Sequence, residues 1–511
     1  MKMQGRNRGI RRALPGLPGP ATVMLFLLSV PSCSFMGDAN GEGRPAARDP
    51  DRPNVILILA DDLGYGEVGV YGQTKIRTPT LDGLARQGIR FTEFYSGSSV
   101  CAPARCTLLT GKHTGHAQVR DNYEMGGWQR GNREGQLPLL PATWTIGRMF
   151  RERGYRTCAI GKWGLGGPGS TGHPNEQGFD HWFGYLCQRQ AHNYYPEHLW
   201  RNDKKVPLEG NVWRNRTGKH YAPDLMIEEA LSWVRENKDR PFFLYFATPV
   251  PHVALQVPED SLAEYRGRWP DPPYDGKKGY LPHESPRAAY AAMVTRMDRD
   301  IGRLLALIDE LGLRKDTLVL FTSDNGPTFN GGTDSTFFVS TAGLRGLKCQ
   351  LYEGGIRVPM IARWPGRIPA GKVTKAPGAF WDLAPTLAEI IGGRVPEDLD
   401  GVSLLDLLRT GRPTIEHPPF YWEYHSGGGW QAVRFGRWKA VRRFVSSPER
   451  RRIEVFDLEA DPNETRDLSK SRPDLVSKAL TLMAARTPSV VESWNFRPKR
   501  KKARTKKKRA R

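Results

Sequence analysis

The chain has 511 residues, more than one ordinary domain holds, so we expect a large domain accompanied by a smaller one. Its hydrophobic content of 39% is enough for a buried core and excludes a wholly disordered chain. Six cysteines in this length exclude a small fold held together by disulfides. Only one stretch, near the N-terminus, is apolar enough to suggest a membrane segment, which excludes a polytopic membrane protein.

The net charge of +22 is concentrated at the two ends of the chain. Residues 497–511 contain 11 lysines and arginines without an acid, and residues 1–33 contain five more, which leaves +6 on residues 34–496. The basic segment 497–511 belongs to a predicted disordered tail over 491–511 and could contact anionic polysaccharide or lipid surfaces through many weak charge pairs. No base-reading motif precedes it, so we expect no nucleic-acid partner.

The first 33 residues have the pattern of an export signal. Basic residues precede an apolar run at 21–30, which is too short to span a bilayer core of ~30 Å but is typical of a signal peptide; an uncleaved anchor helix is the alternative. Val30-Pro-Ser-Cys33 partly matches a lipoprotein processing site, so Cys33 is a candidate for lipid attachment. We expect a signal peptide at 1–33, a linker at 34–52, and a periplasmic or extracellular protein.

Strands and helices alternate from residue 53 to about residue 395. Apolar runs rich in β-branched residues predict buried strands at 54–60, 157–160, 242–247, 318–322 and 358–363. Between them, helical patterns cover 80–87, 143–153, 223–237, 286–311 and 382–391. This alternation predicts an α/β sandwich whose large sheet is mostly parallel and is flanked by helices.

A different pattern begins after about residue 396. Short strands joined by glycine-containing turns are predicted at 420–424, 430–435, 438–441 and 452–456, followed by a helix at 473–485. We therefore expect a catalytic domain over 53–395 and a C-terminal subdomain with a short antiparallel sheet over 396–490.

Acidic residues directly follow two of the predicted strands. Asp61 and Asp62 follow the first strand, and Asp324 and Asn325 follow a later one. In open α/β sheets, ligands usually bind beyond the carboxyl ends of the strands. Three carboxylates and an amide oxygen suit a hard cation such as Ca²⁺ or Mg²⁺. Taken singly, each pair is more often a turn or a helix N-cap.

A short motif around Cys101 carries a candidate nucleophile. Pro103 is suited to the first turn of a helix, which places Cys101 at the N-terminus, where the helix dipole favours negative charge. Arg105, four residues on, lies on the same face and can reach the Cys101 side chain. A nucleophile beside a fixed cation suits attack on an anionic ester, whereas the alternative is a structural thiol.

The Cys101-x-Pro103-x-Arg105 motif, followed by Leu-Thr-Gly, resembles the signature of the formylglycine-dependent sulfatases, in the arylsulfatase A-like branch of the alkaline-phosphatase-like superfamily. Further segments resemble the family in the same order, from about residue 53 to 468. These are 54–66, 78–82, 161–163, 251–252, 323–326, 344–348, 352–359 and 455–462. The resemblance implies an alkaline-phosphatase-like sandwich.

The resemblance also implies a set of roles. Cys101 would be converted to formylglycine by a maturation enzyme, and its hydrated aldehyde would supply the nucleophilic oxygen. One Ca²⁺ per chain would be bound by the modified Cys101 together with Asp61, Asp62, Asp324 and Asn325. The remaining catalytic residues would have three roles. Arg105 would steady the hydrate, and Lys162 and Lys348 would bind sulfate. His252 would protonate the leaving alcohol with help from Lys348.

One position departs from the family pattern. The family commonly has a histidine two residues after the motif lysine, where it is thought to accept a proton from the second hydroxyl of the hydrate, but position 164 is glycine. Candidates to replace it are His113, His116 and His173. The remaining histidines singled out are predicted to be packing or loop residues: His181, His192, His198 and His425. The alternative is that some of them line the substrate pocket, since residues 188–195 are polar and aromatic.

We therefore expect an exported sulfatase that hydrolyses an aryl or carbohydrate sulfate to an alcohol and inorganic sulfate, with a sulfated polysaccharide as a candidate substrate. One alternative is a phosphate or phosphonate ester hydrolase of the same superfamily, against which Cys101 in its motif argues. The other is a non-catalytic binder of sulfated glycans with an unmodified Cys101. An aldehyde at residue 101 would separate the enzyme from the binder.

Overall fold

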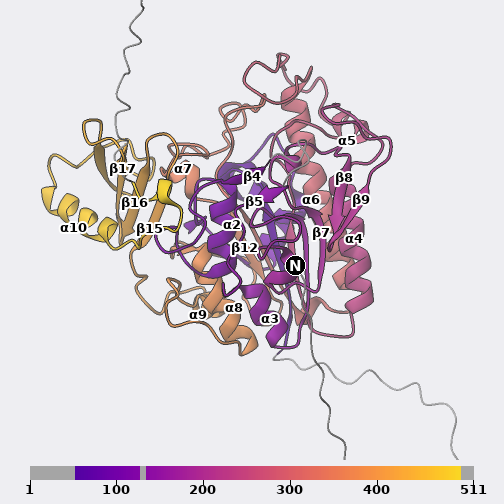
Figure 1. The fold of residues 1–511 in the computed structure, drawn as a ribbon, viewed down its shortest axis with the longest axis horizontal. Coiled ribbons are helices and arrows are strands. Elements are labelled where there is room, and N and C mark those ends of the chain that lie inside the picture. Colours follow the sequence, from indigo (N-terminus) through magenta and orange to yellow (C-terminus); the bar gives the residue numbers. More distant parts are fainter. Residues whose placement is uncertain (1–51, 127–133, 497–511) are drawn as a thin grey trace, which may run out of the picture. The chain divides into compact units, whose positions relative to one another are not determined.

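The computed structural model describes residues 52–126 and 134–496 (Figure 1). The predicted signal peptide 1–33, Cys33 and the predicted linker except its last residue lie outside the described residues. Of the predicted tail 491–511, residues 491–496 are described and include η8 (Glu492–Trp494), whose Trp494 is buried. No helix among the described residues is long and apolar enough to cross a membrane.

A large mixed sheet forms the centre of the described chain. Its ten strands, in their order across the sheet, are β13 (Lys372–Thr374), β2 (Ile89–Phe91), β12 (Met360–Arg363), β11 (Thr317–Ser323), β1 (Asn54–Ala60), β10 (Phe242–Ala247), β6 (Arg156–Lys162), β7 (His181–Tyr185), β8 (His198–Arg201) and β9 (Lys204–Pro207). The run from β11 to β7 is parallel, whereas β12, β8 and β9 pair antiparallel with their neighbours. The predicted α/β class with a mostly parallel sheet is confirmed.

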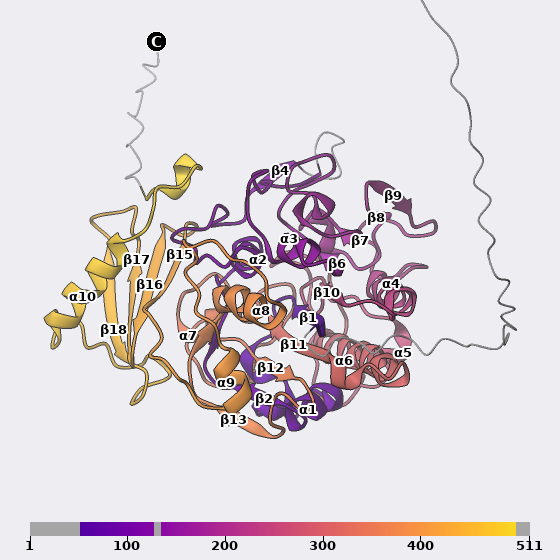
Figure 2. The same cartoon turned by 90° about the horizontal axis from the view of Figure 1, so that it is seen from below.

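Helices cover both faces of this sheet. In chain order they are α1 (Pro79–Arg86), α2 (Cys101–Thr110), α3 (Ile146–Glu152), α4 (Ala222–Asn237), α5 (Glu259–Leu262), α6 (Pro286–Glu310), α7 (Glu353–Ile356), α8 (Leu383–Ile391), α9 (Leu405–Thr410) and α10 (Pro473–Ala484). Figure 2 shows α4 and α6 on one side of the sheet and α2, α3 and α8 on the other.

The sequence of β1 explains why both faces are covered. Its seven residues are all buried, and successive side chains of a strand point to opposite faces. Ile56 and Ile58 join the hydrophobic core that includes α1, α4 and α6. Val55 and Leu57 join the second core, with α2, α3 and α8. A continuous apolar run therefore gives a strand with a core on each side.

A smaller antiparallel sheet follows, as predicted. It consists of β15 (Phe420–Tyr424), β16 (Trp430–Phe435), β17 (Trp438–Arg443) and β18 (Arg452–Asp457). Helix α10 packs against one face, and on the other Trp422 shares a core cluster with Tyr95 and Trp381. Two short pairs complete the strands: β3 (Phe94–Tyr95) with β14 (Gly378–Ala379), and β4 (Glu124–Gly126) with β5 (Gly135–Gln136).

Candidate active site

The metal-ligand candidates lie together at the carboxyl ends of neighbouring strands. Strands β1 and β11 pair in parallel with Ala60 opposite Ser323, so the residues that follow them emerge side by side. The backbone N–H of Asp324 donates to the carbonyl of Ala60 at 3.0 Å, and the N–H of Asp62 donates to Asp324 Oδ1 at 3.0 Å. Two residue pairs that are 262 positions apart in the chain thus form one acidic group.

Cys101 faces this group from the first residue of α2. Its Sγ lies 3.5 Å from Asp61 Oδ1 and 4.0 Å from Asp62 Oδ1. The helix N-terminus therefore points at the acidic group, as the Pro103 motif predicts. Burial nevertheless raises the pKa of the Cys101 thiol, and the nearby carboxylates raise it further against the effect of Lys162 and Lys348. The unmodified thiol is consequently protonated and a poor nucleophile.

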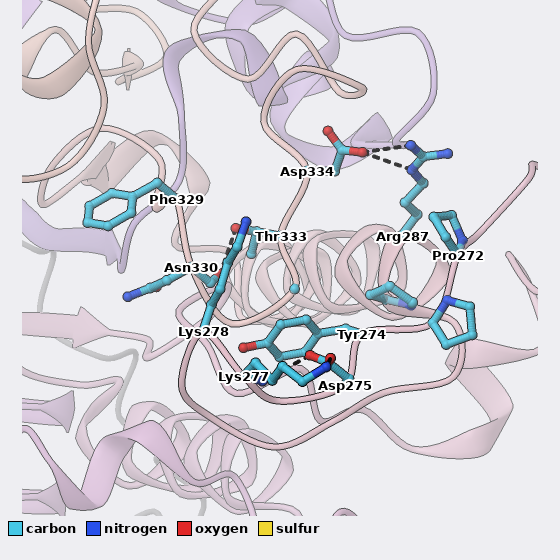
Figure 3. A pocket seen from close by; sticks show the side chains of 13 residues that line it. Pro272, Tyr274, Asp275, Lys277, Lys278, Arg287, Phe329, Asn330, Thr333 and Asp334 are labelled. Carbon is cyan, nitrogen blue, oxygen red and sulfur yellow. Dashed lines mark hydrogen bonds and ion pairs between the residues drawn. The ribbon is translucent and has the colours of Figure 1, made fainter.

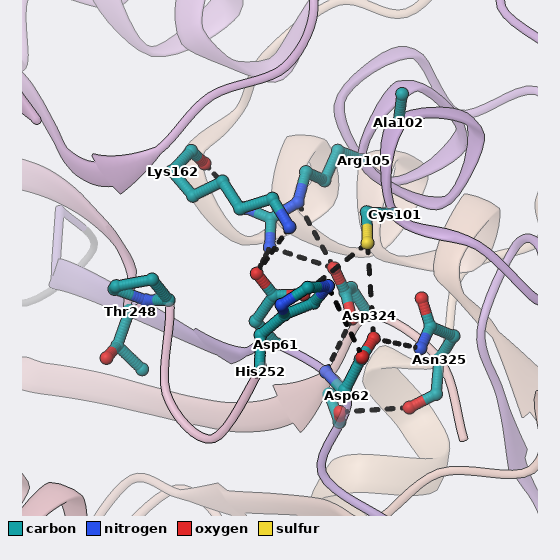
Figure 4. A network of polar contacts seen from close by, with 12 residues as sticks. Asp61, Asp62, Cys101, Ala102, Arg105, Lys162, Thr248, His252, Asp324 and Asn325 are labelled. Atoms are coloured by element: carbon teal, nitrogen blue, oxygen red, sulfur yellow. Dashed lines mark hydrogen bonds and ion pairs between the residues drawn. The ribbon is translucent and has the colours of Figure 1, made fainter. Parts of the chain in front are cut away.

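Three cations, Lys162, Lys348 and Arg105, balance the three carboxylates, and Figure 4 shows two of them, Lys162 and Arg105. Lys162 Nζ lies 2.5 Å from Asp61 Oδ2, and Lys348 Nζ lies 2.6 and 2.7 Å from the two oxygens of Asp62. Lys348 Nζ also lies 3.4 Å from Cys101 Sγ. All these side chains are buried or nearly so, so each charge depends on its neighbours.

Arg105 is bound by groups outside its own helix. Its guanidinium donates to Asp324 Oδ2 from Nε at 3.2 Å and from Nη2 at 2.8 Å, and to the carbonyl of Lys162 at 2.5 Å. That its side chain can reach residue 101, as its position four residues further on indicates, stays a prediction. Arg105 joins the α2 helix to the ends of β11 and β6, because its buried charge requires an acid partner.

The pKa values of the carboxylates differ according to these partners. Burial alone would raise the pKa of Asp61, but the charges of Lys162, Arg105 and Lys348 lower it to about 2. Burial and the charge of Asp61 raise the pKa of Asp324 to about 7 despite Arg105. Burial also raises the pKa of Asp62. Such raised values show that three like charges are crowded here, and a bound dication would relieve this crowding.

The donor atoms fit a hard divalent cation. Acceptor atoms of Asp61, Asp62, Cys101 and His252 all lie within 4.8 Å of one another. Asn325 donates from Nδ2 to Asp62 Oδ1 at 2.7 Å, while its Oδ1 is buried without a hydrogen-bond partner. Asp62 holds a left-handed backbone conformation with φ of 66°, which costs energy for a non-glycine residue and is common at functional sites. Carboxylate and amide oxygens are the ligands that Ca²⁺ prefers.

His252 lies at the edge of the same group, with Nε2 3.5 Å from Asp62 Oδ2. Its Nδ1–H donates to the carbonyl of Val253 at 2.5 Å, which orients the ring so that Nε2 faces the pocket. Burial, Lys348 and Lys162 together lower the pKa of His252 well below its usual range. The ring is therefore neutral until an anion enters the site.

A second histidine lies at this site. His192 was predicted to be a packing or loop residue in a polar and aromatic segment, and its ring packs on that of His252 with centroids 4.2 Å apart. Tyr280, which sequence reasoning did not single out, packs against both rings, at 5.6 and 6.1 Å. No local motif marks Tyr280, and only the fold brings it to the site.

The candidates to replace the family histidine at position 164 lie elsewhere. His113 and His116 stack on each other and contact Asp400, while His173 caps a 3-10 helix. Gly164 has φ of +84°, and a Cβ there would lie 2.4 Å from the amide nitrogen of Gln188. Glutamine thus occupies the space beside this backbone, and its Nε2 is buried without a hydrogen-bond partner.

Comparison with known proteins decides the family. The model of the family described as sulfatase matches residues 53–393, and a model described as the C-terminal part of N-sulphoglucosamine sulphohydrolase matches residues 347–483. The chain belongs to the sulfatase family. It is therefore a sulfuric ester hydrolase, and its sandwich is of the alkaline-phosphatase-like type.

Individual sulfatases are similar over most of their length. N-acetylgalactosamine-6-sulfatase of Rattus norvegicus is 33% identical over 434 residues, which cover 78% of this chain and 73% of that protein. Arylsulfatase A of Homo sapiens is 35% identical over 414 residues, which cover 76% and 74%. The crystal structure of Ps i-CgsB in complex with k-i-k-neocarrahexaose superposes with a TM-score of 0.71 at 30% identity, covering 87% of this chain and 94% of that one.

Proposed function

We propose that this sulfatase hydrolyses a carbohydrate sulfate monoester by means of a formylglycine formed from Cys101 and one bound Ca²⁺. The observation that supports this most strongly is the convergence of Asp61, Asp62, Asp324 and Asn325 on Cys101 in a single buried pocket. A sulfate ester is an anion that repels nucleophiles, so its hydrolysis requires concentrated positive charge next to the attacking group.

The two lysines are suited to binding the sulfate. In the described structure Lys162 is paired with Asp61 and Lys348 with Asp62. A Ca²⁺ held by the carboxylates and by Asn325 would supply charge neutralisation for the ester and would compete with the lysines for these oxygens. Lys162 and Lys348 would then direct their ammonium groups to sulfate oxygens, where each can donate up to three hydrogen bonds.

The protonated state of Cys101 supports its conversion. A buried thiol with a raised pKa neither attacks nor ligates well. The hydrated aldehyde of formylglycine would supply the nucleophilic oxygen at this position. Arg105 lies one turn after Cys101 in α2, and its guanidinium donates to Asp324. In this position it would stabilise the modified residue 101.

His252 is the group we assign to the leaving alcohol. Its ring is fixed by the hydrogen bond from Nδ1, so Nε2 can hold a proton and give it to the departing oxygen. The negative charge of a bound sulfate opposes the lysines that lower its pKa, and this favours protonation when the substrate is present.

The natural substrate and location follow from resemblance and composition. The similar Ps i-CgsB has been crystallised in complex with k-i-k-neocarrahexaose. We infer a sulfated sugar substrate for this chain and a formylglycine-generating enzyme as its maturation partner. We also infer export to the periplasm or cell exterior, with Cys33 as a candidate site of lipid attachment. Residues 497–511 would contact anionic surfaces.

Two measurements test the proposal. Full-length protein, coproduced with a formylglycine-generating enzyme, should release sulfate from an aryl sulfate much faster than phosphate from the corresponding aryl phosphate. Mass spectrometry of the peptide with residue 101 should show an aldehyde, with lower mass than the thiol and no alkylation. A preference for phosphate would favour the superfamily alternative, and an intact thiol with no turnover would favour a non-catalytic glycan binder.

A further inference from the structure

A second cleft is lined by none of the residues assigned a role in the chemistry above (Figure 3). Its volume is about 430 Å³, within the range of ~300–1,000 Å³ that small-molecule sites occupy. One wall is formed by residues 272–278 and the other by residues 329–334. We refer to it as the 272–334 cleft.

Both walls are anchored on residues of the catalytic pocket. The 329–334 wall follows Asn325 in the chain, and Lys348 donates its backbone N–H to the carbonyl of Pro327 at 3.0 Å. Gly331 touches the residue after His252, since a Cβ on it would lie 2.7 Å from the Val253 side chain. The 272–278 wall continues to Tyr280, whose ring packs on His252. A chain-like ligand could therefore occupy both sites at once.

The charges of this cleft favour an anion. Asp334 accepts two hydrogen bonds from Arg287, at 3.0 and 2.7 Å, and Asp275 is paired with Lys277 at 2.6 Å. Both acids are thus neutralised by a neighbour. Lys278 has no acid partner within residues 52–126 and 134–496, and it extends into the cleft towards Thr333.

Neutral groups in the cleft suit a sugar. Asn330 accepts a hydrogen bond at Oδ1 from Thr328, while its Nδ2 donates to no residue in the described part of the chain. The ring of Tyr274 lies across the floor of the cleft, and Phe329 is 54% exposed at its rim. Aromatic faces combined with a few convergent polar groups are typical of carbohydrate-sized ligand sites.

We propose that the 272–334 cleft binds a neighbouring sulfated sugar unit of a polymeric substrate while the scissile sulfate occupies the Cys101 pocket. This inference rests on the proposed function. Lys278 pairs with a sulfate group, Asn330 Nδ2 donates to a sugar oxygen, and Tyr274 and Phe329 contact the apolar face of the ring. The enzyme is then a sulfatase of oligo- or polysaccharides that binds small esters with lower affinity.

Lys278→Glu tests the charge. We use a sulfated dextran oligosaccharide as competitor in the aryl sulfate assay and expect its inhibition constant to rise about fivefold, the upper range for one exposed ion pair. The KM for the aryl sulfate itself should not change. Lys238→Glu is the matched control, because Lys238 is an exposed lysine between α4 and the amino end of β10, whereas the catalytic residues follow the carboxyl ends of the strands. Phe329→Ala should raise the inhibition constant about threefold through lost apolar contact.

A second readout does not depend on turnover. Hydrogen exchange with mass spectrometry should show that sulfated dextran, but not unsulfated dextran, protects residues 272–278 and 329–334. Protection should require about fivefold more sulfated dextran in Lys278→Glu and be unchanged in Lys238→Glu. Absent protection, or equal protection in both variants, would overturn the inference. Failure of aryl sulfate turnover would instead count against the proposed function, since protection is measured without it.

Discussion

The catalytic pocket and the base of the C-terminal sheet are both buried clusters of charge, but they are organised differently. At the base of the C-terminal sheet, Lys439 Nζ lies 2.8 Å from Glu353 and 2.9 Å from Glu464. Burial opposed by Lys439, Arg357 and Arg434 leaves the pKa of Glu353 at about 2, while burial raises that of Glu464 to about 7. Asp61 and Asp324 show the same two values in the pocket.

The difference lies in what occupies the centre. In the Lys439 cluster a lysine sits between the two acids, and the free oxygens accept from Tyr95 and from the backbone of Glu353. In the pocket the cations lie at the periphery, and acceptor atoms face one another within 4.8 Å. Equal pKa values therefore do not distinguish a structural cluster from a ligand site. The arrangement of donors and acceptors does.

The largest expected effect comes from removing the nucleophile. Cys101→Ala should lower sulfate release by at least about 10⁴-fold, since no other group in the pocket can replace the attacking oxygen. Initial rates on an aryl sulfate measure this. Cys106→Ala is the control, because Cys106 is a buried thiol on the same helix outside the cluster. Activity retained by Cys101→Ala would refute the assignment.

Removing the central lysine should affect stability instead of chemistry. Lys439→Met leaves two buried carboxyl groups without their cation, which costs about 3–5 kcal/mol of unfolding free energy. Urea denaturation measures the loss, with exposed Lys315→Met as control. Activity per folded molecule should be unchanged. An unaltered midpoint would mean that the Lys439 cluster contributes little to the fold.

Substitution of His192 tests whether the ring that stacks on His252 contributes to catalysis. His192→Ala removes the ring that packs on His252, and we expect kcat to fall about 10- to 100-fold with KM nearly constant because the proton donor is less well oriented. His192→Phe, which keeps a stacking face, should recover part of the loss. A kcat for the alanine variant equal to the original would show that the stacking is incidental.

The pKa of Asp324 predicts a pH dependence of calcium binding. Its value of about 7 means that a proton must leave before the carboxylate can bind an ion, so affinity should weaken by up to about tenfold per pH unit below pH 7. Titration calorimetry on protein freed of metal, at pH 6 and pH 8, measures this. The free energy of unfolding of the metal-free protein should depend on pH in the opposite direction. Because the folded state holds the Asp324 proton more tightly than the unfolded chain does, the contribution of Asp324 to stability declines as pH rises from about 4 to 7. Tighter binding at pH 6 would contradict the expectation.

Much of the fold was predictable because its strands are long apolar runs. The bounds of β1, β10, β15 and β16 agree with the predicted ranges, since each run ends at a polar or glycine-containing turn. Strands β7, β8 and β9 were not predicted, because β7 and β8 mix aromatic residues with histidine, β9 begins with two lysines, and none is a continuous apolar run. The direction of β12 could not be known from its composition, since apolar strands look alike in parallel and antiparallel pairs.

The candidate site divides in the same way. Asp61, Asp62, Cys101 and the 324–325 pair belong to local motifs at strand ends or a helix start, so the residue types and spacing already indicated a shared pocket. For His192 the polar and aromatic segment around it gave only a general indication, and its stacking on His252 was not predicted. The acid partner of Arg105 was not predicted either, because a same-face position on a helix does not reveal which acid arrives from another strand.

By itself the chain's sequence determined the class of sheet and the family, because these depend on periodicity and on short motifs whose residues are neighbours along the backbone. The nucleophile was predicted from such a motif. Only tertiary structure decided which histidine stacks on His252, which acid neutralises Arg105, and that Lys278 lines a cleft without an acid partner among the described residues. Those outcomes depend on contacts between segments tens to hundreds of residues apart, and burial then sets the energy of every charge among them.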